Sequence, residues 1–217
     1  MFHGALLHLT FVARNLQPRY NIAPTTTIDV IRSGDAGLKL VSMRWGLIPW
    51  WWKKTAKEVP STFNARAKTV AEKPMFRSAF KRTRCIVPAS GYYEWRPAAG
   101  GKQPYFISSA DGTVLSIAGL CDEWKNPETS ETVFSCTVIV TAANDFTRRI
   151  HDRMHVLLSD HDYETWLTCK AGIELLRPTP NDLLRVWAVS KRVNMAGQGD
   201  DDPSLIEPLE GEALHMG

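Results

Sequence analysis

The sequence predicts a single α+β domain with a mostly antiparallel, strongly bent sheet and a few short helices. Short segments rich in β-branched and aromatic residues alternate with turn signals along most of the chain, and no regular strand-helix-strand rhythm is present. No repeat or low-complexity linker divides the 217 residues, and an apolar content of 44% is enough for one sizeable core. We therefore expect one domain over residues 1–217.

The amino-terminal part of the chain gives one ambiguous and one clear element. Residues 1–18 contain the apolar run ALLHLTFV, which fits a strand or a short helix equally well. The segments TIDVIRS and LKLVSMRW, separated by the turn signal GDAG, predict a β-hairpin over residues 27–45. This hairpin would deliver Trp45 to the sheet.

The next part predicts a loop and then helices. After a loop over residues 53–61, Asn64–Arg66 are expected to lead into a helix, and Pro74 to begin a second one. In that second helix Phe76 and Phe80 lie one turn apart, so both should face the core.

The middle of the chain predicts most of the strands. CIVPASGYYEW (85–95) is a strand interrupted at PASG, and PYFISS and TVLSIAGLCDEW form a strand-turn-strand unit. VFSCTVIVTAA (133–143) is nearly all apolar and should be the most buried strand.

Towards the carboxyl terminus the signals are shorter. Asn144 can cap a short helix over residues 144–149, MHVLLS reads as a strand, and Ser159 with Asp162 resembles a capping box before a helix carrying Trp166. RVWAVS predicts the last strand. Residues 195–217 should form an irregular acidic tail, wrapped on the domain or partly mobile.

Charge is distributed unevenly along the chain. The formal net charge is only +3, yet residues 53–84 carry ten Lys and Arg against two Glu, and residues 198–217 carry six acidic residues with no Lys or Arg. A basic block of this size favours an anionic partner, nucleic acid before membrane, because no amphipathic lipid-facing helix accompanies it.

The four cysteines indicate neither a zinc site nor a disulfide framework. Cys85, Cys121, Cys136 and Cys169 include no C-x-x-C pair, and Cys85 and Cys136 lie in apolar runs where buried, inert thiols are expected. We expect no metal and no cofactor. With no signal peptide and no apolar run of membrane-spanning length, we expect a cytoplasmic protein, associated with the nucleoid when bound to DNA.

Residues 44–66, RWGLIPWWWKKTAKEVPSTFNAR, combine tryptophans with cations. Strand alternation would leave at least one of Trp50, Trp51 and Trp52 facing solvent. An exposed indole flanked by Lys53 and Lys54 suits base stacking with phosphate contacts, as in binding of unpaired nucleic acid. The alternative is a hydrophobic corner with solvated lysines.

Four further polar residues are candidates for chemistry. Glu94 lies between aromatic residues, where partial desolvation raises a carboxyl pKa towards general acid-base use, although a strand can also carry Glu on its solvent face. His151 in IHDRMH could titrate near neutrality or be structural, since nothing nearby in sequence supplies a partner. Asn64 and Arg66 could equally serve in capping or salt bridges.

An ordered series of motifs resembles the SOS response-associated peptidase (SRAP) family, which contains abasic-site processing proteins. The resemblance covers residues 19 to about 206 and rests on the following segments: RYNIAPT, RWGLIPWW, FNARA, CIVPASGYYEW, KQPYFI, AGLCDEW, VIVTAAN, IHDRM and VSKRVN. It implies a barrel-like sheet core and a positively charged cleft for single-stranded DNA.

The resemblance also implies roles for single residues. Asn64 matches an asparagine that holds the abasic sugar, Glu94 the catalytic glutamate and His151 the catalytic histidine. The residues implied to bind DNA are Trp51 and Trp52 in an aromatic wedge, Arg66 as a phosphate ligand, and the neighbouring cations Lys53, Lys54 and Lys68.

In the family, an amino-terminal cysteine exposed by autoproteolysis condenses with the ring-opened sugar to give a stable crosslink. This sequence begins MFHGALLHLT, atypical for the family over residues 1–18, and has no cysteine before Cys85. We therefore expect either that the stable crosslink is lost or that the start is misassigned. Lys68 and His155 also depart from the family pattern, in which an acid and a proline are usual.

Three functions remain open from the sequence. The resemblance implies a monomeric enzyme that binds single-stranded DNA, recognises abasic sites and carries autopeptidase, crosslinking and possible lyase activity. One alternative is a non-catalytic single-stranded DNA-binding protein. The other is a hydrolase that uses Glu94 and His151 on a small substrate.

Overall fold

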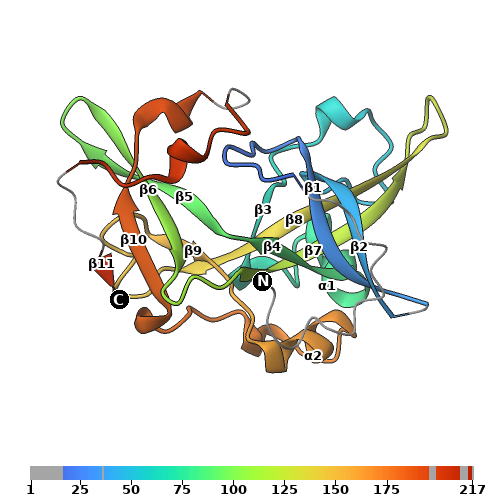
Figure 1. Cartoon of the computed structure of the whole chain (residues 1–217). Helices are drawn as coiled ribbons and strands as arrows, with labels where there is room; N and C mark the ends of the chain where they lie inside the picture. The colour runs from blue at the N-terminus through green and yellow to red at the C-terminus, as the bar shows by residue number, and fades with distance from the viewer. Residues whose placement is uncertain (1–16, 36, 196–198, 211–214, 217) are drawn as a thin grey trace.

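In the computed structural model, residues 17–35, 37–195, 199–210 and 215–216 are described, and two sheets form their framework (Figure 1). The larger sheet has the strand order β2-β1-β4-β7-β8-β3, with β9 also paired to β8. Its strands are β1 (Thr27–Gly34), β2 (Gly37–Trp45), β3 (Asn64–Arg66), β4 (Arg84–Ala89), β7 (Leu115–Lys125), β8 (Thr132–Ala142) and β9 (Arg153–His155).

A parallel pairing closes the larger sheet into a five-stranded barrel. The β1–β2 hairpin pairs in register from Thr27 opposite Arg44 to Gly34 opposite Gly37, as predicted. Trp45 then lies opposite Cys136 on β8, which joins the first strand of the ring to the last. Most other pairings are antiparallel, so the predicted bent, mostly antiparallel, barrel-like sheet is confirmed.

The second sheet has the order β11-β10-β6-β5 and lies beside the barrel (Figure 1). It contains β5 (Gly91–Ala98), β6 (Gly101–Ser109), β10 (Leu184–Ala188) and β11 (His215–Met216). The interruption predicted at PASG falls at Ser90, where the chain passes from β4 in one sheet to β5 in the other. β5 is the edge strand of this sheet, so among the described residues one side of its backbone has no paired strand.

Two short helices cover the outside of the barrel. Pro74 is the first residue of α1 (Pro74–Arg82), as predicted, and Phe76 and Phe80 are both buried. Ser159 and Asp162 form the predicted capping box, followed by α2 (Tyr163–Leu167) with Trp166 fully buried. The Arg84 guanidinium lies over the rings of Phe80 and Trp166, at 4.3 and 4.4 Å from their centroids, and so links the two helices.

Three local expectations differ from the structure. Asn64–Arg66 form a strand parallel to β8, followed only by a single 3-10 turn at Ala67–Thr69, where we expected a helix. Residues 144–149 form hydrogen-bonded turns, not a helix. β8 is buried over residues 135–140, but β7 is buried over residues 115–121. β8 is therefore not the most buried strand, although we expected it to be.

The thiols and the acidic tail behave largely as expected. Cys85, Cys121 and Cys136 are buried, and burial raises the pKa of Cys85 and Cys136, which keeps these thiols protonated.

In the described part of the tail, Leu205 is buried against the second sheet, and Asp200 pairs with Arg19 at 2.7 Å. This part of the tail therefore wraps the domain, whereas the apolar run within residues 1–16 lies outside the described residues.

Candidate active site

Glu94 lies on the edge strand β5, opposite Tyr105 of β6. Tyr92 and Glu94 are two positions apart, so they lie on the same face of β5. Tyr92 is buried on this face, and the Glu94 side chain is 20% exposed. Burial raises the pKa of this carboxyl, and the nearby His151 opposes the rise. A partly desolvated carboxyl of this kind can hold a proton closer to neutral pH than an exposed one, which suits general acid-base catalysis.

His151 has one partner from a distant strand, Glu94, and one next to it in sequence, Asp152, where we expected none. Its Nδ1 lies 3.8 Å from Glu94 Oε2 and 3.3 Å from Asp152 Oδ1. The backbone N–H of Arg153 donates to the same Nδ1 at 3.1 Å. The imidazole is thus held by its Nδ1 side, and Nε2 remains to exchange a proton with a ligand.

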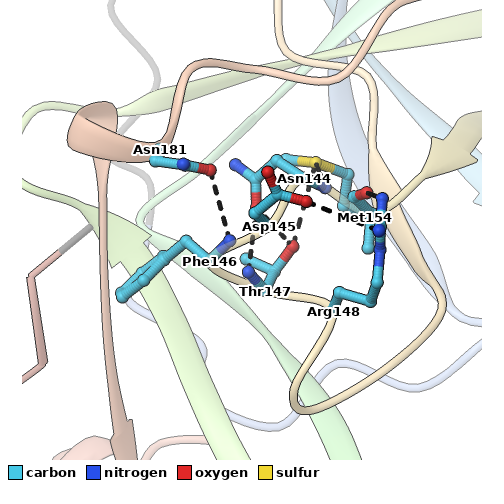
Figure 2. A network of polar contacts seen from close by, with 8 residues as sticks. Asn144, Asp145, Phe146, Thr147, Arg148, Met154 and Asn181 are labelled. Atoms are coloured by element: carbon cyan, nitrogen blue, oxygen red, sulfur yellow. Dashed lines mark hydrogen bonds and ion pairs between the residues drawn. The ribbon is translucent and has the colours of Figure 1, made fainter.

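A dense polar network holds the turn that delivers His151 (Figure 2). Asn144 Oδ1 accepts hydrogen bonds from the backbone N–H and the hydroxyl of Thr147, each at 2.8 Å, and Asn144 Nδ2 donates to Thr179 O at 2.8 Å. The Phe146 N–H donates to Asn181 Oδ1 at 3.2 Å. Asn144 therefore caps this segment as predicted, although the segment it caps is a turn, and the network fixes the approach to His151.

Glu94 and His151 share a pocket of about 430 Å³. Its other lining residues are Trp95, Lys102 and Asn194, and the Trp95 indole N–H donates to Asn194 Oδ1 at 2.8 Å. A larger pocket of about 610 Å³ lies against residues 143–145 and 177–181 and contains none of the predicted site residues. Because the smaller pocket contains the acid-base pair, we take it as the candidate active site.

Asn64 and Arg66 lie on β3, where both are exposed. In register, Asn64 faces Val138 and Arg66 faces Val140 of β8, and Val140 in turn faces His155 of β9. β8 therefore connects β3 with the strand that follows His151. Asn64 is not among the residues lining the Glu94 pocket, so its role in holding the abasic sugar stays a prediction.

The tryptophan-rich segment adopts turns and not the strand that we used to assign its faces. Trp50 is 54% exposed, whereas Trp51 and Trp52 are half-buried with ring centroids 6.1 Å apart. The Trp52 indole N–H donates to Thr55 O at 3.0 Å. The backbone carbonyl of Trp52 accepts a hydrogen bond from the Trp124 indole N–H at 2.7 Å. One tryptophan does face solvent, as expected, but neither Trp51 nor Trp52 lines the Glu94 pocket.

Three lysines of the basic block lie at the surface. Lys53, Lys54 and Lys68 are exposed, and Lys54 lies 3.8 Å from Glu58 within a local pair. An exposed pair of this kind contributes little to stability, so these cations remain available to an anionic ligand.

Sequence reasoning missed several residues of the pocket. Lys102 and Asn194 belong to the motifs KQPYFI and VSKRVN, which carried the resemblance but no assigned role, and Trp95 was read as a strand residue. Trp50 was recognised within the tryptophan run, but the sequence could not say which of the three rings is exposed.

The described residues contain neither a cluster of metal ligands nor a membrane-spanning helix. No group of three or more His, Cys, Asp or Glu in that part of the chain is arranged to hold a metal ion. In the same residues, no helix has the length and apolar character needed to cross a membrane.

Comparison with known proteins places this geometry in a family. The family model of the SOS response associated peptidase (SRAP) matches residues 6–196. The chain is 37% identical to the abasic site processing protein YoqW of Bacillus subtilis (strain 168), covering 88% of this chain and 86% of that protein. It is 31% identical to the abasic site processing protein HMCES of Gallus gallus, covering 89% of this chain and 67% of that protein.

Solved structures agree with the fold. A protein from Bacteroides thetaiotaomicron matches with a TM-score of 0.78 at 30% identity, covering 85% of this chain and 82% of the other. A protein from Bordetella bronchiseptica matches with a TM-score of 0.71 at 31% identity, covering 80% and 90%. The family match, the shared fold and the relatives' identity over most of their length together show that this chain belongs to the SRAP family.

Proposed function

We propose that this protein binds single-stranded DNA and processes abasic sites through covalent chemistry in the Glu94–His151 pocket. The observation that carries the proposal is the approach of these two side chains, 57 positions apart in sequence, to 3.8 Å within one pocket of a chain whose relatives are abasic site processing proteins.

The chemistry of the pair fits a ring-opened abasic sugar. Such a sugar presents an aldehyde, and addition of an amine to an aldehyde requires a proton to be delivered to the carbonyl oxygen and later removed from nitrogen. Burial raises the pKa of Glu94, so this carboxyl can act as the proton donor, and the His151 imidazole can accept and return protons. The two groups together supply both transfers.

The surface chemistry supports an unpaired DNA strand as ligand. The exposed Arg66, Lys53, Lys54 and Lys68 belong to the basic block of residues 53–84, and the exposed Trp50 ring lies three residues before this block. Cations bind phosphates, and an aromatic ring can stack on a base that has no partner. We assign Asn64 to the abasic sugar, Trp51 and Trp52 to the aromatic wedge, and Arg66 with these lysines to the DNA backbone.

A binding experiment tests the DNA part of the proposal. Affinity would be measured for a single-stranded oligonucleotide with one abasic site, the same strand intact, and the intact duplex, at several salt concentrations. We expect the abasic single strand to bind most tightly and the logarithm of the affinity to fall linearly with the logarithm of salt. An affinity that does not change with salt would contradict the electrostatic role of the basic block.

A trapping experiment tests the covalent part. Borohydride reduces an imine to a stable amine, so an imine between the protein and the abasic strand would become a permanent adduct. A non-catalytic single-stranded DNA-binding protein would bind with the same salt dependence and give no adduct. A small-substrate hydrolase would give neither binding nor adduct.

We further propose that the protein acts as a monomer in the cytoplasm, at the nucleoid when bound to DNA.

A further inference from the structure

The pocket that holds Glu94 and His151 also holds a primary amine. Lys102 lines it, and no other lysine does. Lys102 is the second residue of β6 and lies opposite Pro97 of β5, at the end of the β5–β6 hairpin. This amine therefore shares a pocket with the two groups suited to moving protons at a carbonyl.

The hairpin turn fixes where Lys102 begins its strand. Gly100 and Gly101 have φ angles of 78° and 125°, in the region that favours glycine, and they reverse the chain just before Lys102. From Gly101 opposite Ala98 onward, the strands pair in continuous register as far as Ser108 opposite Gly91. The attachment point of the Lys102 side chain is thus set by the same two strands that set Glu94.

Lys102 has no acidic partner in the described part of the chain. Ion pairs occupy Arg32, Lys54, Arg148 and Arg153, and Glu94 lies next to His151, but none of the described carboxylates lies within 4.0 Å of the Lys102 amine. An unpaired amine at the wall of a pocket is free to approach a ligand.

We propose that Lys102 is a nucleophile that forms an imine with the aldehyde of a ring-opened abasic sugar. This inference rests on the proposed function, since it names a residue for that same pocket. The neutral Lys102 amine attacks C1′ of the aldehyde and forms the N–C bond. The carbonyl oxygen takes up a proton, nitrogen loses one, and the carbinolamine expels water to give the imine.

Two outcomes follow from the imine, and each balances without an external oxidant or reductant. Water can add to C1′ and release the free amine and the aldehyde again. Alternatively a base removes the C2′ proton, the C3′–O bond breaks, and the downstream strand departs with its 5′-phosphate, while the upstream strand keeps the unsaturated sugar. Glu94 and His151 lie in the same pocket to deliver and accept these protons.

The test uses the full chain and a single-stranded oligonucleotide with one abasic site, in the presence of borohydride. Lys102→Arg keeps the positive charge and removes the nucleophile, since a guanidinium stays protonated. Lys125→Arg is the matched control, because Lys125 ends β7 and does not line the pocket. Adducts would be quantified by denaturing electrophoresis, and the modified residue would be identified by peptide mass spectrometry.

We expect Lys102→Arg to lower adduct formation at least tenfold, Lys125→Arg to leave it unchanged, and the mapped adduct to lie on Lys102. Unchanged trapping in Lys102→Arg, or an adduct mapped to another amine, would overturn the inference. Tight, salt-dependent binding without any adduct would overturn it and leave the DNA-binding part of the proposed function intact. Absence of DNA binding would overturn both.

Discussion

Glu94 is a carboxyl group that the fold keeps partly out of water, and its ionised form is destabilised there. Because its folded-state pKa is raised, the folded protein keeps this proton at pH values where the unfolded chain has released it. The contribution of Glu94 to stability therefore falls as pH rises from the unfolded pKa of about 4.3 to the folded one, and neutral pH carries the full penalty.

Glu94→Gln should therefore raise Tm at pH 7, because the amide has no charge to desolvate. The gain should shrink as the pH falls to about 3, where the carboxyl is protonated in the unfolded chain as well. Calorimetry at both pH values checks this. Asp152→Asn is the control, because that side chain is 74% exposed and should change Tm little. Equal gains at both pH values would contradict the burial argument.

His155, which packs against Tyr92 of β5, is a second titratable group, and its effect on stability has the opposite pH dependence to that of Glu94. Its ring lies 4.4 Å from that of Tyr92 in an edge contact, and within the described structure its Nδ1 and the Tyr92 hydroxyl are both buried without hydrogen-bond partners. Burial lowers the pKa of His155 to about 4. Protonation favours the unfolded chain, so stability is lost as pH falls from about 6.5 towards 4.

His155→Leu should remove this acid limb, which is worth roughly 3 kcal/mol between pH 6.5 and 4. The measurement is the free energy of unfolding by urea at several pH values, for the variant and the parent. Glu94 titrates in an overlapping range in both proteins, so its contribution cancels in their difference. Parallel profiles of the two proteins would show that His155 is not buried in its neutral form.

At the level of elements, the passage from β4 to β5 places Glu94, and Gly91 makes that passage possible. A Cβ on Gly91 would lie 2.3 Å from Phe106 Cζ and 2.5 Å from the carbonyl oxygen of Ile107. The backbone contact cannot move aside, so Gly91→Ala should push β5 away from β6. We expect a loss of about 1–3 kcal/mol in the free energy of unfolding, measured in urea.

The exposed Ser90, one residue earlier, provides the control for that substitution. Ser90→Ala should stay within about 0.5 kcal/mol of the parent, because surface changes rarely exceed this. A Gly91→Ala variant as stable as Ser90→Ala would mean that β5 and β6 can separate at no cost, contrary to the tight contact.

The tryptophan-rich segment and β3 together form the element proposed to hold DNA. Arg66→Ala should weaken single-strand binding and reduce the salt slope by about one, because one phosphate contact is lost. Trp50→Ala and Trp52→Ala should each weaken binding by about 1–3 kcal/mol if a base stacks on that ring. Fluorescence anisotropy titration of the three variants measures these effects. An unchanged salt slope in Arg66→Ala would remove it from the phosphate path.

Across the whole molecule, local signals predicted most elements, and long-range contacts decided the rest. The turn signal GDAG and the proline at position 74 act over a few residues, so the hairpin and the start of α1 could be predicted from them. β3 was misread because its pairing partner, β8, lies more than 70 positions away. Asn144 makes the predicted cap hydrogen bonds, but contacts with residues 179 and 181 replace the expected helix.

The candidate active site also depends on both local sequence signals and long-range contacts. Residue chemistry and motif resemblance indicated Glu94 and His151 as candidates, yet only the fold brings β5 of one sheet close to His151, which lies two residues before β9 of the other sheet. Lys102 lies at the end of the β5–β6 hairpin, and Asn194 ends the 3-10 turn Lys191–Asn194. Both line the pocket because the fold brings these two elements together. Periodicity cannot reveal that convergence, because Lys102 and Glu94 lie on different strands of a hairpin and Asn194 is more than 40 positions from His151.

The central claim is that the Glu94–His151 pair performs covalent chemistry on abasic sites, and borohydride trapping tests it most directly. The parent chain, Glu94→Gln and His151→Ala would each be incubated with abasic and intact single strands, and the initial rate of adduct formation measured. We predict an adduct with the abasic strand only, slowed by about 10²–10⁴-fold in each variant while binding of the intact strand is unchanged. Equal adduct rates in the parent and both variants would contradict the account.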